Sequence, residues 1–187
     1  KRGRSLIQKL TSSSRGQPIN YELINPNDEI EETLRLLNRT MGVHIMIVPE
    51  LGAEVPNIFT DLNDFQNALL NLAVNARNAM QDGGVLKFST VKKYFPGEYS
   101  TGDIVLLPGE YVEIDVVDDG CGMAQDVLEK ATEPYFTTRE VGEGSGLGLS
   151  AVYGFCRQSK GGFEIMSALG EGTTVRMILP AARDIAL

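Results

Sequence analysis

Asn71-Leu-Ala-Val-Asn75-Ala-Arg-Asn78-Ala-Met80 is the second half of the strongest helical pattern in the chain, which covers residues 61–80. At about 100° per residue, apolar and asparagine side chains of this pattern fall on opposite faces. The apolar face consists of Leu62, Phe65, Leu69, Leu72, Ala76 and Ala79, and the other face carries Asn67, Asn71, Asn75 and Asn78. Asparagine is a poor helix former, but its neutral amide offers an oxygen to a hard cation and an NH2 group to a phosphate. The asparagine row could therefore hold magnesium and phosphates; the alternative is a solvated face without a ligand.

A second motif, Asp118-Asp-Gly-Cys-Gly-Met123, follows a predicted strand over residues 111–117. Its glycines, Gly120 and Gly122, permit positive φ angles and the close approach of a ligand. An aspartate at the end of a strand can accept a hydrogen bond from an exocyclic amine, which is one way to recognise adenine. The competing interpretation is a tight turn, because Asp-Gly is a common turn dipeptide, and Asp119 is expected to be a solvated turn residue.

A glycine-rich segment, Gly142-Glu-Gly-Ser-Gly-Leu-Gly-Leu-Ser150, opens a predicted helix over residues 147–158. It lacks the third glycine of a dinucleotide fingerprint, and the chain contains no G-K-[ST] P-loop. Backbone N–H groups at the start of a helix suit anionic oxygens. The alternative for Gly148 and Leu149 is close backbone packing.

Residues 133–139, Glu-Pro-Tyr-Phe-Thr-Thr-Arg, bring aromatic rings, hydroxyls and a guanidinium group next to the glycine-rich segment. Arg139 could clamp a phosphate. Tyr135 and Phe136 are expected to anchor the segment to the core.

The remaining pattern predicts a two-layer α/β sandwich with a mixed or antiparallel sheet, because helices are collected between strands and several strand pairs are adjacent in sequence. The other predicted helices cover residues 28–38, with a cap at Asn27-Asp28-Glu29, and residues 127–131. The other predicted strands cover residues 43–48, 85–91, 162–167 and 173–179. A polar loop is predicted between the strands at 85–91 and 111–117.

Composition limits the class of protein. The 187 residues are 42% hydrophobic, which is enough for one sizeable core, and 17 basic against 25 acidic residues give a net charge of −8, which argues against a nucleic-acid surface. No apolar run approaches the roughly 20 residues that span a bilayer, so the chain is expected to be cytoplasmic. Cys121 and Cys156 are far apart and are interpreted as reduced thiols. The chain begins at Lys1, so it is interpreted as a piece of a longer protein.

Together these motifs resemble the conserved boxes of sensor histidine kinases, in order along residues 18–180. The boxes are the N box (71–80), the G1 box (118–122), the F box (133–139), the G2 box (144–150) and a final glycine motif, Gly170-Glu-Gly-Thr-Thr174. The resemblance implies that residues 18–187 are the catalytic and ATP-binding domain. It implies the Bergerat-type fold shared with gyrase, heat-shock chaperone and mismatch-repair ATPases, with a mixed sheet, helices on one face and a mobile ATP lid. Residues 1–17 resemble the end of the dimerisation and phosphoacceptor helix.

The resemblance also implies ATP and magnesium as ligands, and Asn71 and Asn75 as catalytic residues. Asn75 matches the magnesium-chelating asparagine, Asp118 matches the adenine-reading aspartate, and Thr173 would help to close the adenine pocket. The full set implied to bind nucleotide is Asn71, Asn75, Asn78, Asp118, Gly120, Gly122, Met123, Thr138, Arg139, Gly144, Ser145, Gly146, Leu147, Gly148, Leu149 and Thr173. Many family members have lysine at the position of Asn78, so Arg139 or the partner helical domain would have to supply that charge.

Asn71 distinguishes the functions open to this fold. Hydrolytic relatives place a glutamate at this position as a general base, and an amide cannot take a proton. The expected activity is therefore transfer of the γ-phosphoryl of ATP to a protein histidine, with an ATP-dependent interaction module and a hydrolytic ATPase as alternatives. His44, the only histidine, is expected to lie exposed on a strand or sheet edge and to be structural.

The acceptor would then be a histidine of the preceding helical domain, outside this chain. The expected partners are that helical domain and the receiver domain of a response regulator, with no nucleic acid and no direct membrane contact. A receiver domain could follow Leu187.

Overall fold

A computed structural model of the chain describes residues 20–42, 44–138 and 145–182. Its centre is a five-stranded sheet in the order β2-β4-β7-β9-β8. β2 is parallel to β4 and all other neighbours are antiparallel, so the predicted mixed sheet is confirmed. The strands are β2 (Ile45–Leu51), β4 (Gly84–Phe95), β7 (Gly109–Asp118), β8 (Gly162–Ala168) and β9 (Gly172–Pro180).

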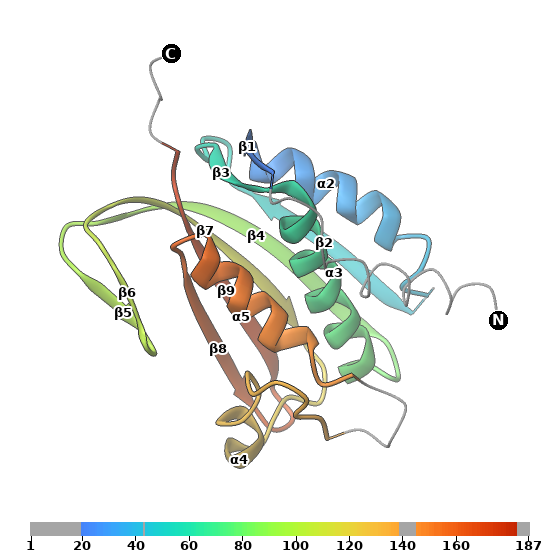
Figure 1. The fold of residues 1–187 in the computed structure, drawn as a ribbon. Coiled ribbons are helices and arrows are strands. Elements are labelled where there is room, and N and C mark those ends of the chain that lie inside the picture. Colours follow the sequence, from blue (N-terminus) through green and yellow to red (C-terminus); the bar gives the residue numbers. More distant parts are fainter. Residues whose placement is uncertain (1–19, 43, 139–144, 183–187) are drawn as a thin grey trace.

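Helices α2 (Pro26–Leu37), α3 (Leu62–Ala79) and α5 (Gly148–Gln158) lie on one face of this sheet, and the short α4 (Gln125–Leu128) lies near one end of it (Figure 1). The predicted two-layer α/β sandwich is confirmed. The core lies between the layers, where Phe65 and Leu69 of α3 and Phe88 and Ile114 of the sheet are fully buried. Burying aromatic and branched side chains of this size is the main stabilising term of the fold.

Helix α3 shows how closely local sequence determines an element. Asp61, the first residue of the predicted helix, is its N-cap, and the Asp61 carboxylate accepts a hydrogen bond from the N–H of Asp64 at 3.1 Å. The chain leaves the helix at Met80 and turns through Gly83, whose φ is +94°. The predicted span of 61–80 therefore differs from the observed span only by its two capping residues.

Several predicted boundaries need correction. Strand β4 extends four residues beyond its predicted end at residue 91, and the short helix predicted over residues 127–131 is found at Gln125–Leu128. Helix α2 begins two residues before the predicted start, because the Asn25 side chain accepts from the N–H of Asn27 and Pro26 occupies the first turn, where its fixed φ suits a helix. Strand β2 continues beyond residue 48 to Leu51, because its parallel pairing with β4 extends through Pro49. Proline is tolerated there because β2 is an edge strand.

A small antiparallel sheet of β1 (Tyr21–Ile24) and β3 (Ile58–Asp61) was not predicted from the sequence. Each strand has only four residues, too few for a clear alternation. Their pairing is supported by stacking of the Tyr21 and Phe59 rings at a centroid distance of 5.7 Å.

The prediction of a loop between the strands at 85–91 and 111–117 is also wrong. This segment contains the hairpin of β5 (Tyr99–Thr101) and β6 (Ile104–Leu106). The hairpin is stabilised by a second apolar cluster, in which Tyr99 and Ile104 pack on buried residues that include Phe95, Leu106, Tyr111 and Ile178. The hairpin was missed because each of its strands has only three residues and because Pro96, Gly97 and Gly102 in this segment are typical of a loop.

In the part of the chain that the structure describes, no helix is both long enough and apolar enough to cross a membrane.

Candidate functional site

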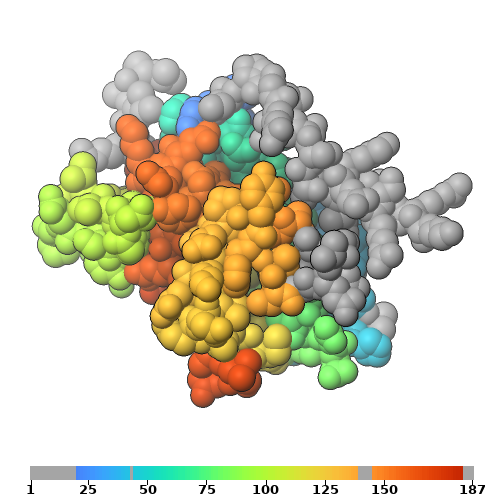
Figure 2. Space-filling model, turned by 60° about the horizontal axis from the view of Figure 1, so that its bottom comes forward, coloured from blue at the N-terminus to red at the C-terminus, as the bar shows by residue number. Residues whose placement is uncertain are grey.

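The motif segments of the sequence analysis meet at one end of the sandwich. In Figure 2 the yellow segment after β7 lies between the red β8–β9 turn and the orange start of α5. Backbone hydrogen bonds fix this arrangement: the N–H of Cys121 donates to the carbonyl of Ala79 at 3.0 Å, and the N–H of Gly170 donates to the carbonyl of Cys121 at 2.7 Å. The end of α3, the turn after Asp118 and the β8–β9 turn are thereby joined.

Two glycines make this joint possible. A Cβ at Gly120 would lie 2.7 Å from the Cβ of Ala79, so a side chain there would separate the turn from α3. Gly122 has a φ of +64°, and a Cβ there would overlap the carbonyl of Ala168. Both positions therefore require glycine for close packing, in addition to any close approach of a ligand.

Asp118, the last residue of β7, is only 8% exposed. Its carboxylate accepts a hydrogen bond from the N–H of Gly120 at 2.9 Å. Burial raises the pKa of Asp118 above its ordinary value of 3.8, although hydrogen bonds from the N–H groups of Gly120 and Thr173 oppose that shift and the charge of Asp119 adds to it. A buried carboxylate with remaining lone pairs is suited to accept from a ligand N–H group.

Asp119 is exposed as expected, but it is more than a solvated turn residue. Its carboxylate accepts a hydrogen bond from the N–H of Val85 at 2.8 Å and so ties the turn to the start of β4. This contact could not be predicted from local sequence, because Val85 and Asp119 are 34 positions apart in the chain.

Ser167 of β8 is a site residue that sequence reasoning missed. Its hydroxyl accepts from the N–H of Met123 at 2.9 Å, donates to the carbonyl of Gly172 at 2.9 Å and lies 2.9 Å from the hydroxyl of Thr173. Met123 and Thr173 were both expected at the site, and Ser167 is the residue that connects them. Only the register of the β8–β9 pair, which places Ser167 directly opposite Thr173, could have identified Ser167 from the sequence.

The asparagine face of α3 lies next to the start of α5. Asn67, Asn71, Asn75 and Asn78 are all half-buried. The position of a Cβ at Gly148 lies 3.2 Å from Nδ2 of Asn75, so the Asn75 amide contacts the first residue of α5. Among the described residues, no hydrogen bond joins the side-chain amides of Asn71, Asn75 and Asn78, which leaves their donors and acceptors available to a ligand.

The N-terminus of α5 faces this amide without a side-chain cap. Its N-cap residue, Leu147, makes no capping hydrogen bond, and its first turn contains no acidic residue. Free N–H groups and the helix dipole at such a terminus attract anionic oxygens. The combination of a neutral amide and a helix N-terminus is therefore suited to phosphate groups.

The segment of residues 133–138 is attached to the glycine-rich segment through its backbone. The N–H of Tyr135 donates to the carbonyl of Gly146 at 2.9 Å, and Gly146 has a φ of +63°. The expectation that the Tyr135 ring anchors the segment in the core is wrong, because this side chain is 70% exposed. Phe136 is half-buried.

The remaining predicted site residues differ in position. Ser145 and Thr138 are exposed, and Leu147 is 40% exposed. Leu149 is partly buried and packs against the core, which favours the packing interpretation of this residue. Arg139 and Gly144 lie outside the described residues, as does the predicted helix end at residues 1–17.

His44 is exposed, as expected, but it lies in the turn before the edge strand β2 and not on the predicted strand of residues 43–48. Cys156 is buried, which raises the pKa of its thiol and leaves it unreactive, and Cys121 is exposed; neither forms a disulfide.

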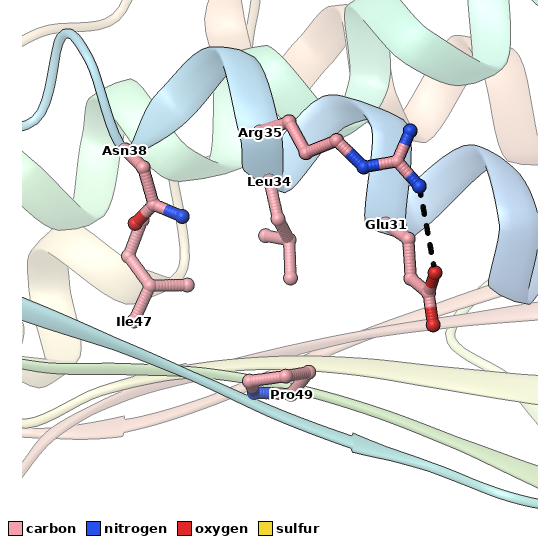
Figure 3. Close-up of a pocket in the computed structure, with 6 residues that line it drawn as sticks. All are labelled: Glu31, Leu34, Arg35, Asn38, Ile47 and Pro49. Carbon is pink, nitrogen blue, oxygen red and sulfur yellow. Dashed lines mark ion pairs between the residues drawn. The ribbon is translucent and has the colours of Figure 1, made fainter.

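A hollow between α2 and β2 is separate from the motif residues (Figure 3). It has a volume of about 250 Å³ and is lined by Glu31, Leu34, Arg35, Asn38, Ile47 and Pro49. Arg35 and Glu31 form an ion pair at its rim at 3.6 Å, with both side chains more than half exposed. None of the lining residues belongs to a predicted motif, so this hollow is not the candidate site.

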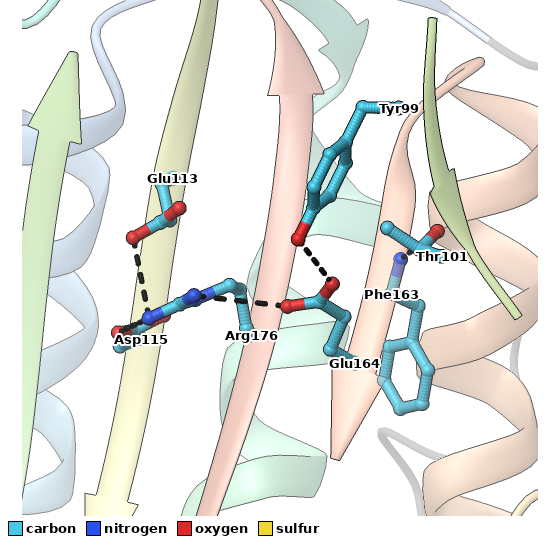
Figure 4. Close-up of polar contacts among 7 residues, drawn as sticks. All are labelled: Tyr99, Thr101, Glu113, Asp115, Phe163, Glu164 and Arg176. Carbon is cyan, nitrogen blue, oxygen red and sulfur yellow. Dashed lines mark hydrogen bonds and ion pairs between the residues drawn. The ribbon is translucent and has the colours of Figure 1, made fainter. Parts of the chain in front are cut away.

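A charged cluster occupies the sheet face opposite the helices (Figure 4). Arg176 forms a two-pronged hydrogen-bonded ion pair with Asp115, with both distances 2.8 Å, and further ion pairs with Glu113 at 3.3 Å and Glu164 at 3.7 Å. The Tyr99 hydroxyl donates to Glu164 at 2.9 Å and links the β5–β6 hairpin to the cluster. This cluster has a structural role, because all its members are paired.

Comparison with known proteins agrees with this geometry. Residues 60–183 match the family model described as histidine kinase-, DNA gyrase B- and HSP90-like ATPase. The sensor kinase CckA of Brucella abortus is 38% identical over 179 residues, which cover 96% of this chain and 19% of that protein. Sporulation kinase E of Bacillus subtilis is 29% identical over 185 residues, covering 98% of this chain and 23% of that protein. The chain thus spans about a fifth of the length of these relatives.

Solved structures agree in fold. The mycobacterial sensor histidine kinase MprB superposes with a TM-score of 0.68 at 21% identity, covering 86% of this chain and 97% of that one. The catalytic domain of the histidine kinase ThkA superposes with a TM-score of 0.67 at 23% identity, covering 88% of this chain and 99% of that one.

Proposed function

Because this chain belongs to the histidine kinase-, DNA gyrase B- and HSP90-like ATPase family, we propose that it is the ATP-binding catalytic domain of a sensor histidine kinase. In this proposal it transfers the γ-phosphoryl group of ATP to a histidine of a helical domain outside the chain, and residues 1–17 are the end of that domain. A response-regulator receiver domain would be the next acceptor, in the cytoplasm. Names of the relatives as sensor and sporulation kinases support this choice among the activities of the family.

The observation that carries the proposal is the contact between Asn75 and the uncapped N-terminus of α5, at the same end of the sandwich as the buried carboxylate of Asp118. The base would contact Asp118, and the phosphates would lie between the asparagine face of α3 and the start of α5. Both ends of a nucleotide thereby meet complementary chemistry: an acceptor for the amine and donors for the phosphates.

A magnesium ion fits the residues at Asn75. Within the described ranges, no group of three His, Cys, Asp or Glu side chains is placed to hold a metal. Magnesium bound with ATP does not need such a group, since it takes most of its oxygen ligands from phosphates and water. The Asn75 amide oxygen would supply the protein ligand, and the ion would neutralise charge on the phosphates.

Transfer requires little covalent chemistry from the protein. A neutral imidazole nitrogen forms the new bond to the γ-phosphorus while the bond to the β,γ-bridging oxygen breaks and ADP leaves with that electron pair. The N–H groups at the start of α5 would stabilise the charge that accumulates on the phosphates. Asn71 lies one turn before Asn75 and cannot act as a general base for water, which favours transfer over hydrolysis.

The test is transfer in trans. The chain is mixed with the separately prepared helical domain of its parent protein, magnesium and γ-labelled ATP, and we expect label on the histidine of the helical domain. Asn75→Ala should abolish transfer. Asn63→Ala is the matched control, because Asn63 is exposed on the same helix about 18 Å away. Binding without transfer would support an interaction module instead, and steady phosphate release from the chain alone would support a hydrolase.

A further inference from the structure

Three polar side chains form a row across the sheet at the candidate site. Thr173 is paired directly with Asp118 of β7 on one side and with Ser167 of β8 on the other. Directly opposite residues of antiparallel strands project from the same face. The row is on the helix-covered face, since Val116 and Val175, two residues away from Asp118 and Thr173 along their strands, are core residues.

The hydroxyl of Ser167 has all of its hydrogen bonds assigned. It carries one proton, which it donates to the carbonyl of Gly172 at 2.9 Å. It accepts one hydrogen bond from the N–H of Met123 at 2.9 Å. The only hydrogen bond left to it is as an acceptor, so the Thr173 hydroxyl, 2.9 Å away, must be the donor in that contact.

We infer that Ser167 is a specificity-determining residue of the nucleotide site, because it fixes the direction of the Thr173 hydroxyl. With its proton committed to Ser167, Thr173 presents only lone pairs to a ligand. This inference rests on the proposed function, in which the base of ATP contacts Asp118.

Asp118 is a second acceptor beside Thr173. Its carboxylate accepts from the N–H groups of Gly120 and Thr173, so it too faces a ligand with lone pairs. Two neighbouring acceptors bind a base edge that carries an exocyclic amine, such as the 6-amino group of adenine. They repel a base with an oxo group at that position, because the oxo group is itself an acceptor.

The experiment compares ATP with inosine triphosphate, which has a 6-oxo group in place of the 6-amino group. The dissociation constants of both, with magnesium, give a discrimination ratio for the wild-type chain and each variant. In Ser167→Ala the Thr173 proton is free to donate to the 6-oxo group, so the ratio should fall by about fivefold, the size of one neutral hydrogen bond. Ser167→Thr keeps the hydroxyl and should restore the ratio.

A double-mutant cycle separates this role from a merely structural one. Thr173→Val removes the hydroxyl at almost constant volume and should lower the ratio as Ser167→Ala does. If Ser167 acts through Thr173, Ser167→Ala should change the ratio no further in the Thr173→Val background. Should Ser167→Ala fail to fold, Ser167→Cys takes its place, because a thiol is only a weak acceptor.

The outcomes are distinguishable. ATP binding with an unchanged ratio in Ser167→Ala, or additive effects in the double variant, would overturn this inference and leave the proposed function standing. If the wild-type chain bound no ATP, the proposed function would fail and the inference with it. A lowered ratio that Ser167→Thr restores supports both.

Discussion

In the proposed function, recognition of the base depends on Asp118. Replacing it by asparagine exchanges a charged acceptor for a neutral amide, whose NH2 group would oppose the N–H groups of Gly120 and Thr173. Loss of a charge-assisted hydrogen bond should lower the affinity for an ATP analogue by roughly tenfold to a hundredfold. Calorimetric titration measures this. Glu171→Gln is the control, because it removes one charge from an exposed side chain of the nearby β8–β9 turn and should leave the affinity almost unchanged.

The titration of Asp118 gives a prediction with a definite sign. Its pKa is raised, chiefly by burial, so the carboxyl group takes up its proton at a higher pH than an ordinary aspartate with a pKa of 3.8. The protonated form loses acceptor capacity, so affinity for the ATP analogue should fall as the pH is lowered through that raised pKa. Measurement between about pH 8 and pH 4 should show a steeper loss in the wild type than in Asp118→Asn. Because the nucleotide phosphates also titrate, equal losses in both would contradict the assignment.

The substitution Gly122→Ala tests how tightly the turn after β7 is packed. Alanine at this position would be strained at a φ of +64° and would overlap the carbonyl of Ala168. We expect a loss of about 2 kcal/mol or more in the free energy of unfolding, measured by urea denaturation. Gly154→Ala is the opposite control: this glycine lies inside α5 with no atom within 4 Å of a Cβ, so alanine should stabilise the chain by about 0.5–1 kcal/mol. Equal effects of the two substitutions would show that the turn is not close-packed.

The individual site residues that sequence predicted were those with an unusual local pattern. Asn75 was apparent from the asparagine face of a helix, and Asp118 from two glycines after a strand. Ser167 and the contact of Asp119 with Val85 were missed because their chemistry depends on partners brought close only by strand pairing. A serine in a strand has no local signature of such a role.

At the scale of elements, the same distinction separates correct from incorrect predictions. Helix α3 and strands β8 and β9 have strong periodic patterns and were predicted almost to the residue. The β5–β6 hairpin was predicted as a loop because its strands have only three residues each and are surrounded by Pro96, Gly97 and Gly102, and because its stabilising contacts come from other strands, including Ile178 of β9. Local pattern determines an element when its buried face is long enough to be recognised, and tertiary packing determines the rest.

The charged cluster that joins β7, β9 and β8 provides a prediction at this scale. Arg176→Gln would leave three half-buried carboxylates, Glu113, Asp115 and Glu164, without their shared cation. We expect a loss of about 2 kcal/mol in the free energy of unfolding. Arg35→Gln is the matched control, since its single ion pair is exposed and should contribute less than about 0.5 kcal/mol.

The pH dependence of the Arg176→Gln variant checks the cause. Burial already raises the pKa of Glu113 despite the opposing effect of Arg176, and loss of the arginine should raise it further. A carboxyl group with a raised pKa in the folded state contributes stability below its unfolded pKa and loses it as the pH rises through the folded pKa. The deficit of the variant relative to the wild type should therefore grow from acidic to neutral pH. A deficit independent of pH would assign the effect to packing instead.

For the whole molecule, the order of the strands explains why motifs far apart in sequence meet. β7 and β9 are antiparallel neighbours, so the C-terminal end of β7 lies beside the N-terminal end of β9 and places Asp118 opposite Thr173. Helix α3 ends at the same place, where the carbonyl of Ala79 accepts a hydrogen bond from the N–H of Cys121 in the turn after β7. α5 packs on α3 and brings Gly148 to Asn75. The site is thus a consequence of the topology, and its parts cannot be displaced independently.

This arrangement predicts that nucleotide binding stabilises the entire chain, because in the proposed site the ligand would contact α3, α5 and the sheet, which come together in the folded state only. At a free concentration of one hundred times the dissociation constant, a ligand adds about 2.7 kcal/mol to the free energy of unfolding. For a chain of this length that corresponds to a rise in melting temperature of roughly 5–10 °C. A thermal scan with an ATP analogue and magnesium should show this rise, and chelation of the magnesium or Asn75→Ala should reduce it, whereas Asn63→Ala should not. A rise that neither Asn75→Ala nor chelation reduces would mean that the phosphates are bound somewhere other than between α3 and α5.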